Sequence, residues 1–330
     1  MYRRLALIAT VLMTALACQN DNSAVPPPGG GEFWSTVPQT DEQRMEVLRR
    51  VRAVDTCALL PRSELAEIGT VITVGTDRLN SCAAELDSSE PHRGKAIRWA
   101  LIGPVAELRN ERGSIEYLGD VAISLLSDTD TMRQELAATL VERSCSAVAR
   151  MPATAAISLS VRTPLGVEPC PLAKSLLTTA LTEWKRQPRQ GDSNDTVSTA
   201  LTDADPCAVL PRLGITAKPT EQQIASCVFT HHGDEIRLTY DYTHEYLVTA
   251  GGVAFSVGDR PVYRDAAEEL RFYNAAIGPP IGPPIGPPIG PPIGPPNSDF
   301  PGPRLPTISL TGTNDTALEE VMRQALSLFP

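Results

Sequence analysis

Hydrophobic and polar residues alternate along this chain with two periods, and these periods predict helices and strands in a definite order. Met45, Leu48, Val51 and Val54 recur at helical spacing, so residues 41–54 are predicted to form a helix. Shorter apolar runs bounded by Gly, Asn and Asp are typical of strands. We expect strands at 71–74, around Cys82, at 96–102, at 121–126 and at 156–161.

Three further helices are predicted in the first half. A short one begins near Pro61, because proline suits the first turn of a helix and acidic residues follow it. A long amphipathic helix is expected over residues 131–151, where apolar residues recur at helical spacing and Cys145 lies inside the segment. A closing helix is expected over residues 171–184, with a proline at its start and basic residues at its end.

A sequence motif returns in the second half. Asp55-Thr-Cys-Ala-Leu-Leu-Pro-Arg62 recurs as Asp205-Pro-Cys-Ala-Val-Leu-Pro-Arg212, with six of the eight positions identical. A second cysteine follows each copy, Cys82 in the first and Cys227 in the second. The motif therefore indicates that one small domain is used twice.

The predicted elements recur in the same order as the motif. Strands at 235–241, 253–257 and 307–311 match those at 97–99, 121–125 and 156–160. Helices at 265–276 and 316–329 match the long helix and the closing helix of the first half. Agreement in both motif and element order indicates an internal repeat.

We therefore predict an α+β fold of two tandem repeats of a small disulfide-stapled domain, each an antiparallel sheet packed with helices. The first domain spans residues 41–186 and the second spans residues 205–330. Residues 187–204 carry no core pattern and are interpreted as a linker. The length of 330 residues is enough for two ordinary domains.

One insertion distinguishes the second copy. Ile277-Gly-Pro-Pro is repeated five times, and the proline-rich insert extends over residues 277–304, where the first half has only residues 151–155. A period of four excludes collagen, which needs glycine at every third residue. The insert is expected to be a semi-rigid surface loop; the alternative is a docking segment for an aromatic-lined groove.

The N-terminal residues predict export and membrane attachment. Residues 1–17 have a basic start and an apolar run too short to span a bilayer, which takes about 20 residues, so they are interpreted as a signal peptide. Ala15-Leu16-Ala17 before Cys18 resembles a bacterial lipobox, although leucine is commoner at the position of Ala15. We expect Cys18 to be the lipidated first residue of the mature protein; otherwise it is an ordinary residue near a cleavage site. Acyl chains would then hold the protein to the membrane.

Residues 18–40 are interpreted as the lipidated N-terminus and a flexible tether, because Pro, Gly, Asn and Ser cannot build a core. Trp34, in this tether, is a candidate interfacial anchor.

Six cysteines remain in the body of the chain, and six cysteines allow 15 pairings. If the halves are equivalent, Cys57–Cys82 corresponds to Cys207–Cys227, which leaves Cys145–Cys170. Each such bridge stabilises the fold by about 3 kcal/mol in the chain-entropy model. A cysteine metal site is disfavoured, because no Cys-x-x-Cys occurs and an exported protein meets an oxidising environment.

Charge and motifs exclude several functions. The net charge of -10 argues against nucleic acid, whose phosphates need a basic face. No nucleophile elbow, zinc-protease motif, phosphate loop or dinucleotide fingerprint occurs. We therefore predict no catalytic residue, no metal site and no cofactor.

The histidines offer one polar cluster for a metal. His231 and His232 precede a predicted turn, whereas Asp241, His244 and Glu245 lie at the far end of the next strand. The two groups would be separated by about 20 Å or more, at about 3.3 Å per strand residue. They are expected not to converge on one ion and are interpreted as solvated turn residues.

The remaining polar residues of the motif have structural interpretations. Asp55 and Asp205 each precede a predicted helix and are expected to cap it or to hold a turn. Arg62 and Arg212 are expected to bond nearby carbonyls or acids. Trp99, at a strand centre, is expected in the core or facing a partner.

Together, the lipobox at Cys18, the Asp-x-Cys-x-Leu-Leu start and the second cysteine on a following strand resemble a family of actinobacterial cell-envelope lipoproteins of unknown function. The resemblance covers both copies. Such families commonly place a tryptophan near the strand cysteine, whereas Ala83 and Val228 follow the cysteines here. The resemblance implies a location and a style of fold, and no activity.

We expect an exported lipoprotein, anchored on the outer face of the cytoplasmic membrane, that acts as a non-enzymatic binding or accessory protein of the cell envelope. Its partners would be the membrane, through the N-terminal lipid, and an envelope protein, a cell-wall fragment or a small molecule. The alternatives are an envelope hydrolase or other enzyme with a site built from scattered residues, and a structural spacer.

Overall fold

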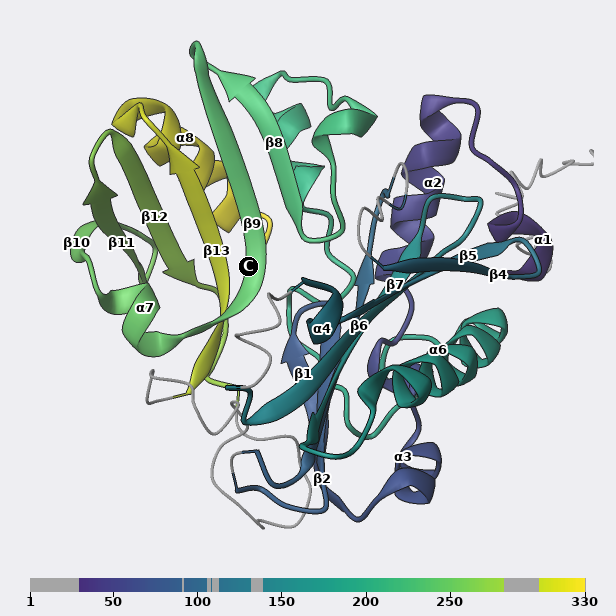
Figure 1. Cartoon of the computed structure of the whole chain (residues 1–330). Coiled ribbons are helices and arrows are strands. Elements are labelled where there is room, and N and C mark those ends of the chain that lie inside the picture. Colours follow the sequence, from purple (N-terminus) through teal and green to yellow (C-terminus); the bar gives the residue numbers. More distant parts are fainter. Residues whose placement is uncertain are drawn as a thin grey trace, which may run out of the picture.

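A computed structural model describes residues 30–90, 92–105, 108, 113–131, 139–281 and 303–329. They form two antiparallel sheets, each packed against helices and each with its own hydrophobic core (Figure 1). The predicted α+β class is confirmed, and the two sheets fit two tandem domains. The expected signal peptide, Cys18 and most of the proline-rich insert lie outside the described residues.

The first domain contains a seven-stranded sheet in the order β1-β2-β3-β7-β6-β5-β4. Its strands are β1 Val71–Arg78, β2 Ser81–Leu86, β3 Lys95–Ile102, β4 Ser114–Leu118, β5 Val121–Ser127, β6 Glu142–Arg150 and β7 Ala156–Pro164. Its helices are α1 Gly30–Trp34, α2 Asp41–Arg52, the 3-10 helix η1 Cys57–Leu59, α3 Arg62–Ile68, α4 Asp128–Thr131 and α6 Pro169–Arg186.

The second domain contains a six-stranded sheet in the order β10-β11-β12-β13-β9-β8. Its strands are β8 Ser226–His231, β9 Asp234–His244, β10 Gly252–Val257, β11 Arg260–Ala267, β12 Leu270–Ala276 and β13 Arg304–Gly312. Its helices are the 3-10 helices η2 Pro206–Leu213 and η3 Pro219–Glu221, followed by α7 Glu245–Thr249 and α8 Asp315–Leu326.

The two sheets share one topology. The order β2-β3-β7-β6-β5-β4 in the first domain corresponds to β8-β9-β13-β12-β11-β10 in the second, and β1 is an additional edge strand. The registers agree as well: Cys82 pairs with Trp99 and Trp99 with Leu159, while Cys227 pairs with Leu238 and Leu238 with Leu310. The tandem repeat therefore extends to individual strand positions.

The two predicted long helices are wrong where the structure describes them. The C-terminal part of segment 131–151 is strand β6, and segment 265–276 covers the end of β11 and all of β12. β6 and β12 occupy the same place in the two sheets, so both corrected helices correspond to one strand of the repeat. Strand β6 buries alternate residues, Cys145, Ala147 and Ala149, and this period of two is that of a sheet.

One predicted match between strands of the two halves is also wrong. Segment 253–257 is predicted to match segment 121–125, but it forms β10, which corresponds to β4. The true counterpart of β5 is β11. Short apolar runs look alike in sequence, and only the pairing order distinguishes them. The predicted helices that begin at Asp41, near Pro61 and at the two closing segments are confirmed as α2, α3, α6 and α8.

Three disulfides join the pairs expected from the sequence. Cys57–Cys82 ties η1 to β2, and Cys207–Cys227 ties η2 to β8, so these two bridges are equivalent. Cys145–Cys170 joins β6 to α6, which means that Cys145 lies on a strand and not on a helix. In all three pairs the Cα atoms are 5.1–5.3 Å apart, as is usual for disulfides.

The expected tether ends earlier than residue 40. Trp34 is only 4% exposed, and its ring packs on that of Trp184 in α6 with centroids 4.7 Å apart. Its proposed role as an exposed interfacial anchor is therefore wrong. Thr40 then caps α2 through a capping box with Gln43, which fixes the start of that helix. No helix in the described ranges is long and apolar enough to cross a membrane.

Candidate functional site: the seam between the domains

The acid of the first motif copy connects the first domain to residues 187–204. The Asp55 side chain is fully buried and accepts hydrogen bonds from the backbone N–H groups of Cys57 and Ala58, as expected of a turn residue. It also accepts from the N–H groups of Gly191 and Ser193, each at 3.0 Å, and from the Thr196 hydroxyl. Three of these five donors, those of Gly191, Ser193 and Thr196, belong to the expected linker and hold it against the domain.

Residues 187–204 contact both domains. Asp195 is 8% exposed and forms a bidentate pair with Arg62, the last residue of the first motif, whose NH2 group (Nη2) lies 2.6 Å from the carboxylate. Leu201 is fully buried in the second core. The segment joins the domains as a structured connection. Arg212, the counterpart of Arg62, donates to the Ser327 hydroxyl instead.

The acid of the second copy reaches across to the first domain. Asp205 accepts from the Cys207 N–H at 2.9 Å, as Asp55 does from Cys57. Its Oδ1 atom also lies 3.1 Å from Nη1 of Arg52, at the end of α2. The acid of the motif therefore holds a turn in both copies, and in addition it binds the connecting segment in the first copy and Arg52 in the second.

Arg52 is the central residue of this seam. Its side chain is 5% exposed, and it donates from Nε to the Ile224 carbonyl and from Nη2 to the Gln223 carbonyl, both at 2.9 Å. Burial lowers the pKa of Arg52, and the negative charge of Asp205 opposes that shift. A buried guanidinium with two carbonyl acceptors and a carboxylate fixes the relative position of α2 and the second domain.

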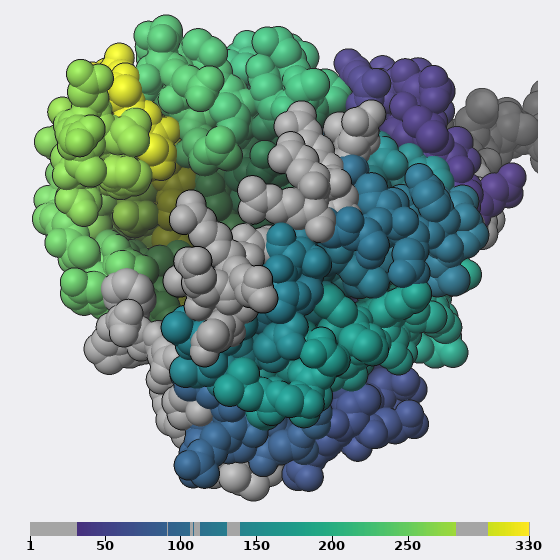
Figure 2. Space-filling model, in the orientation of Figure 1, coloured from purple at the N-terminus to yellow at the C-terminus, as the bar shows by residue number. Residues whose placement is uncertain are grey.

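Side chains from each domain also enter the core of the other. Ile224, just before β8, is 6% exposed and belongs to the first core, while Leu79, just after β1, packs on the second. Asp77 of β1 contacts Arg304, the first residue of β13, at 3.2 Å. Figure 2 shows the domains as adjoining lobes, with purple α2 beside the green second domain. Because Arg304 is the last residue of the proline-rich insert, that insert ends at the seam.

A hollow of about 630 Å³ lies at the seam between α2 and the segment around η2 and η3. We call it the acidic hollow. Its lining is Asp41, Glu42, Met45, Glu46, Arg49, Arg52, Asp203, Asp205, Ala217 and Pro219.

The charge of the acidic hollow is negative. Both arginines are engaged, Arg49 with Glu46 at 2.6 Å and Arg52 with Asp205. The Asp203 carboxylate makes no hydrogen bond or close ion pair with the described part of the chain. Burial raises the pKa of Asp203, although Arg49 and Arg52 counter the shift. Asp203 therefore carries a negative charge that the protein only partly neutralises.

A second hollow, of about 360 Å³, lies farther along the seam, where Arg78, Gln223 and Asp241 are among its lining residues. Arg78 lies 3.7 Å from Asp241, and burial raises the pKa of that carboxyl. This lining is of mixed charge. It has no excess of either sign comparable to that of the acidic hollow.

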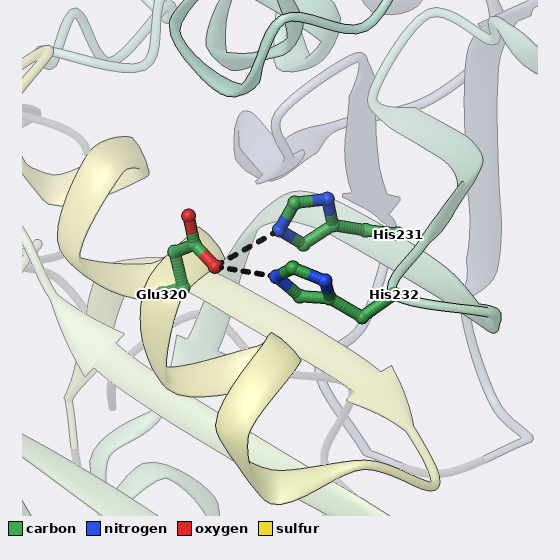
Figure 3. A group of neighbouring side chains, drawn as sticks. All are labelled: His231, His232 and Glu320. Atoms are coloured by element: carbon green, nitrogen blue, oxygen red, sulfur yellow. Dashed lines mark hydrogen bonds and ion pairs between the residues drawn. The ribbon is translucent and has the colours of Figure 1, made fainter.

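The structure separates the polar residues that the sequence placed at the two ends of one strand. Asp241 and His244 lie at the far end of β9 from His231 and His232, as expected, and Glu245 begins α7. His231 and His232 meet Glu320 of α8 instead (Figure 3). The sequence does not predict the contact of Glu320 with these histidines, because that contact depends on how α8 packs against the sheet.

Two further candidate residues have local partners. Trp99 is fully buried and donates from its indole nitrogen to the Thr56 carbonyl at 2.6 Å, so it is a core residue of the first domain. His92 lies 3.0 Å from a carboxylate oxygen of Glu142 on β6. Neither lines either of the two hollows.

Comparison with known protein families, curated proteins and solved structures finds no match to this chain. The geometry of the seam is therefore the basis for a functional assignment.

Proposed function

We propose that this chain is an exported, lipid-anchored binding protein of the cell envelope, and that its acidic hollow takes a positively charged ligand. The hollow is the observation that carries the proposal. Ligand sites are commonly clefts of about 300–1,000 Å³, and they occur preferentially at domain interfaces. Met45, Ala217 and Pro219 supply the apolar part here.

The charges of the lining favour a cation. Asp41, Glu46 and Asp205 each have an arginine partner, whereas Glu42 and Asp203 form no ion pair within the described part of the chain. A cationic group placed beside Asp203 would neutralise a partly desolvated carboxylate. The ligand class that fits is a small polyamine-like molecule or a basic segment of an envelope protein.

The lining supports binding more than catalysis. It offers carboxylates and guanidinium groups but no serine, cysteine or histidine that could act as a nucleophile with a neighbouring base. The N-terminal lipobox and the resemblance to envelope lipoproteins support the location on the outer face of the cytoplasmic membrane.

A titration with charged probes tests the acidic hollow. Spermidine and a four-arginine peptide are expected to bind and to raise the melting temperature, and citrate is expected to do neither. Asp203→Asn and Glu42→Gln are each expected to weaken binding of the cations about threefold or more. Asp259→Asn is the matched control, since it removes one exposed charge in the β10–β11 turn. Equal losses in the control and in Asp203→Asn would refute a defined site.

Acid should weaken this binding. The raised pKa of Asp203 means that its carboxyl becomes protonated at a higher pH than an ordinary aspartic acid does on acidification. Affinity for spermidine is expected to be full near pH 7 and to fall toward pH 4, with a smaller fall in Asp203→Asn. Calorimetric titration at several pH values measures both, and an affinity that rises toward pH 4 contradicts the assignment.

Replacing Cys18 by serine tests the anchor. The variant is expected to be released into the soluble fraction, because the lipid attachment would be lost, while the wild-type protein stays with membranes. Fractionation and immunoblotting measure the distribution. Membrane retention equal to that of the wild type would argue against lipidation and would leave the acidic hollow unaffected.

A further inference from the structure

We propose that His231, His232 and Glu320 form a binding site for a divalent transition-metal cation of the zinc and copper class. The site belongs to the second domain, and it is independent of the acidic hollow.

The hairpin between β8 and β9 brings the two imidazoles together. His231 ends β8 and pairs with Asp234 at the start of β9, which leaves His232 and Gly233 as a two-residue turn. Both turn residues have positive φ, 49° for His232 and 79° for Gly233, as in a type I′ turn. Adjacent residues of a strand point to opposite faces. Here the left-handed conformation of His232 turns its ring toward that of His231, and the ring centroids lie 4.1 Å apart.

Buried hydrogen bonds place α8 over this hairpin. Asp234, 8% exposed, accepts from the Thr313 N–H at 2.8 Å, from the Thr313 hydroxyl at 2.6 Å and from the Asn314 N–H at 3.0 Å. Asn314 in turn caps α8. The residue that starts β9 therefore also holds the start of the helix that carries Glu320.

The three side chains offer donor atoms at metal-ligand separations. Oε2 of Glu320 lies 3.1 Å from Nε2 of His231 and 2.9 Å from Nε2 of His232, and all three donor atoms lie within 4.8 Å of one another (Figure 3). Ligand atoms about 2.0–2.1 Å from a tetrahedral zinc ion are about 3.3 Å apart. A small movement of each side chain would therefore admit an ion.

The present contacts of these three side chains would allow a metal ion to replace the hydrogen bonds between them. Both Nε2 atoms lie within hydrogen-bond distance of the same carboxylate oxygen, Oε2 of Glu320. The side chains of His232 and Glu320 are 54% and 46% exposed, whereas that of His231 is 10% exposed. One ligand is thus held by packing, and the open side can supply water molecules to complete the coordination.

The donor set selects the class of metal. Two imidazoles and one carboxylate suit Zn²⁺, Cu²⁺ and Ni²⁺, whereas Mg²⁺ and Ca²⁺ prefer oxygen ligands. The first domain has no equivalent hairpin, since residues 87–94 connect β2 to β3 there, and its His92 meets a single carboxylate, that of Glu142. Metal binding would therefore distinguish the second copy from the first.

Calorimetric titration of the untagged Cys18→Ser chain with Zn²⁺ tests the site. We expect saturable binding of one Zn²⁺ per chain, a higher melting temperature that EDTA reverses, and no response to Mg²⁺. His231→Ala, His232→Asn and Glu320→Gln are each expected to reduce affinity about tenfold or more. Asparagine tolerates the left-handed conformation of residue 232, so His232→Asn removes the imidazole while the hairpin is kept.

Three matched controls separate this site from general metal affinity. His92→Ala, His244→Ala and Glu319→Gln are expected to bind Zn²⁺ as the wild type does. Co²⁺ in place of Zn²⁺ gives a second readout, because its visible absorption spectrum should change in the wild type and not in His232→Asn. Absence of saturable Zn²⁺ binding, or equal affinity in wild type and His232→Asn, would overturn the proposal.

Discussion

Replacing Asp55 by alanine is expected to lower the free energy of unfolding by about 4 kcal/mol, the largest effect of any single substitution considered. The substitution removes the acceptor of five hydrogen bonds from a site without solvent access. The N–H groups of Cys57, Gly191 and Ser193 would then lose the carboxylate that accepts their hydrogen bonds. Asp55→Asn should lose nearly as much, because the amide NH2 group would face these same donors.

The internal repeat supplies the control. Asp205→Ala removes the same residue of the motif in the second copy, but the Asp205 side chain is 40% exposed and accepts one backbone hydrogen bond beside its pair with Arg52. Its loss is expected to be about 1–2 kcal/mol. Urea denaturation of the Cys18→Ser chain, followed by tryptophan fluorescence, measures both. Equal effects in the two copies would contradict the assignment of Asp55 as the residue that holds segment 187–204.

Arg52→Met is expected to uncouple the domains. Methionine keeps the apolar stem but leaves the carbonyls of Gln223 and Ile224 without their donor, and it leaves Asp205 without its partner. We expect a loss of about 3 kcal/mol and the replacement of one thermal transition by two, because each domain has its own core and sheet. Differential scanning calorimetry measures the transitions, and hydrogen exchange at residues 223–226 should increase.

Arg44→Met is the control on the same helix. Arg44 pairs with Asp41 at 2.8 Å, but both side chains are well exposed, and pairs of this kind contribute little. This variant is expected to change stability by about 0.5 kcal/mol or less and to keep a single transition. A single, unshifted transition in Arg52→Met would show that the apolar contacts of Ile224 and Leu79 suffice to hold the domains together.

The duplication explains how one motif can serve two purposes. In both copies the acid accepts the N–H of the motif cysteine, and the cysteine is bonded to the first strand of the shared topology, β2 or β8. Each carboxylate also has a second set of partners, which is the connecting segment in the first copy and Arg52 in the second. The acidic hollow borders the second arrangement, and the proposed metal site lies at the other end of β8.

Features that depend on local chemistry and on the repeat could be predicted from the sequence. The motif, the three disulfide pairs, the capping acids, the proline at the start of a helix and the closing helices all follow from residues close in the chain. The equivalence of Cys57–Cys82 and Cys207–Cys227 needed only the alignment of the two halves. The predictions of caps and helix starts succeeded because they rest on contacts within about one element. The disulfides, whose cysteines lie 20–25 residues apart, could be predicted because the repeat restricts the pairing.

The strand at 265–276, the cluster of two histidines with Glu320 and the contacts between the domains depend on which elements pair, and these features appear only in the tertiary structure. Segment 265–276 has residues at helical spacing, yet most of it forms β12, an interior strand between β11 and β13. Burial of Tyr273 and Ala275 on one face of the sheet outweighs that local pattern. Glu320 meets His231 and His232 only because β13 delivers α8 to the β8–β9 hairpin. The acidic hollow and the role of Arg52 likewise arise from the packing of the two domains against each other, and this packing cannot be predicted from any single segment of the chain.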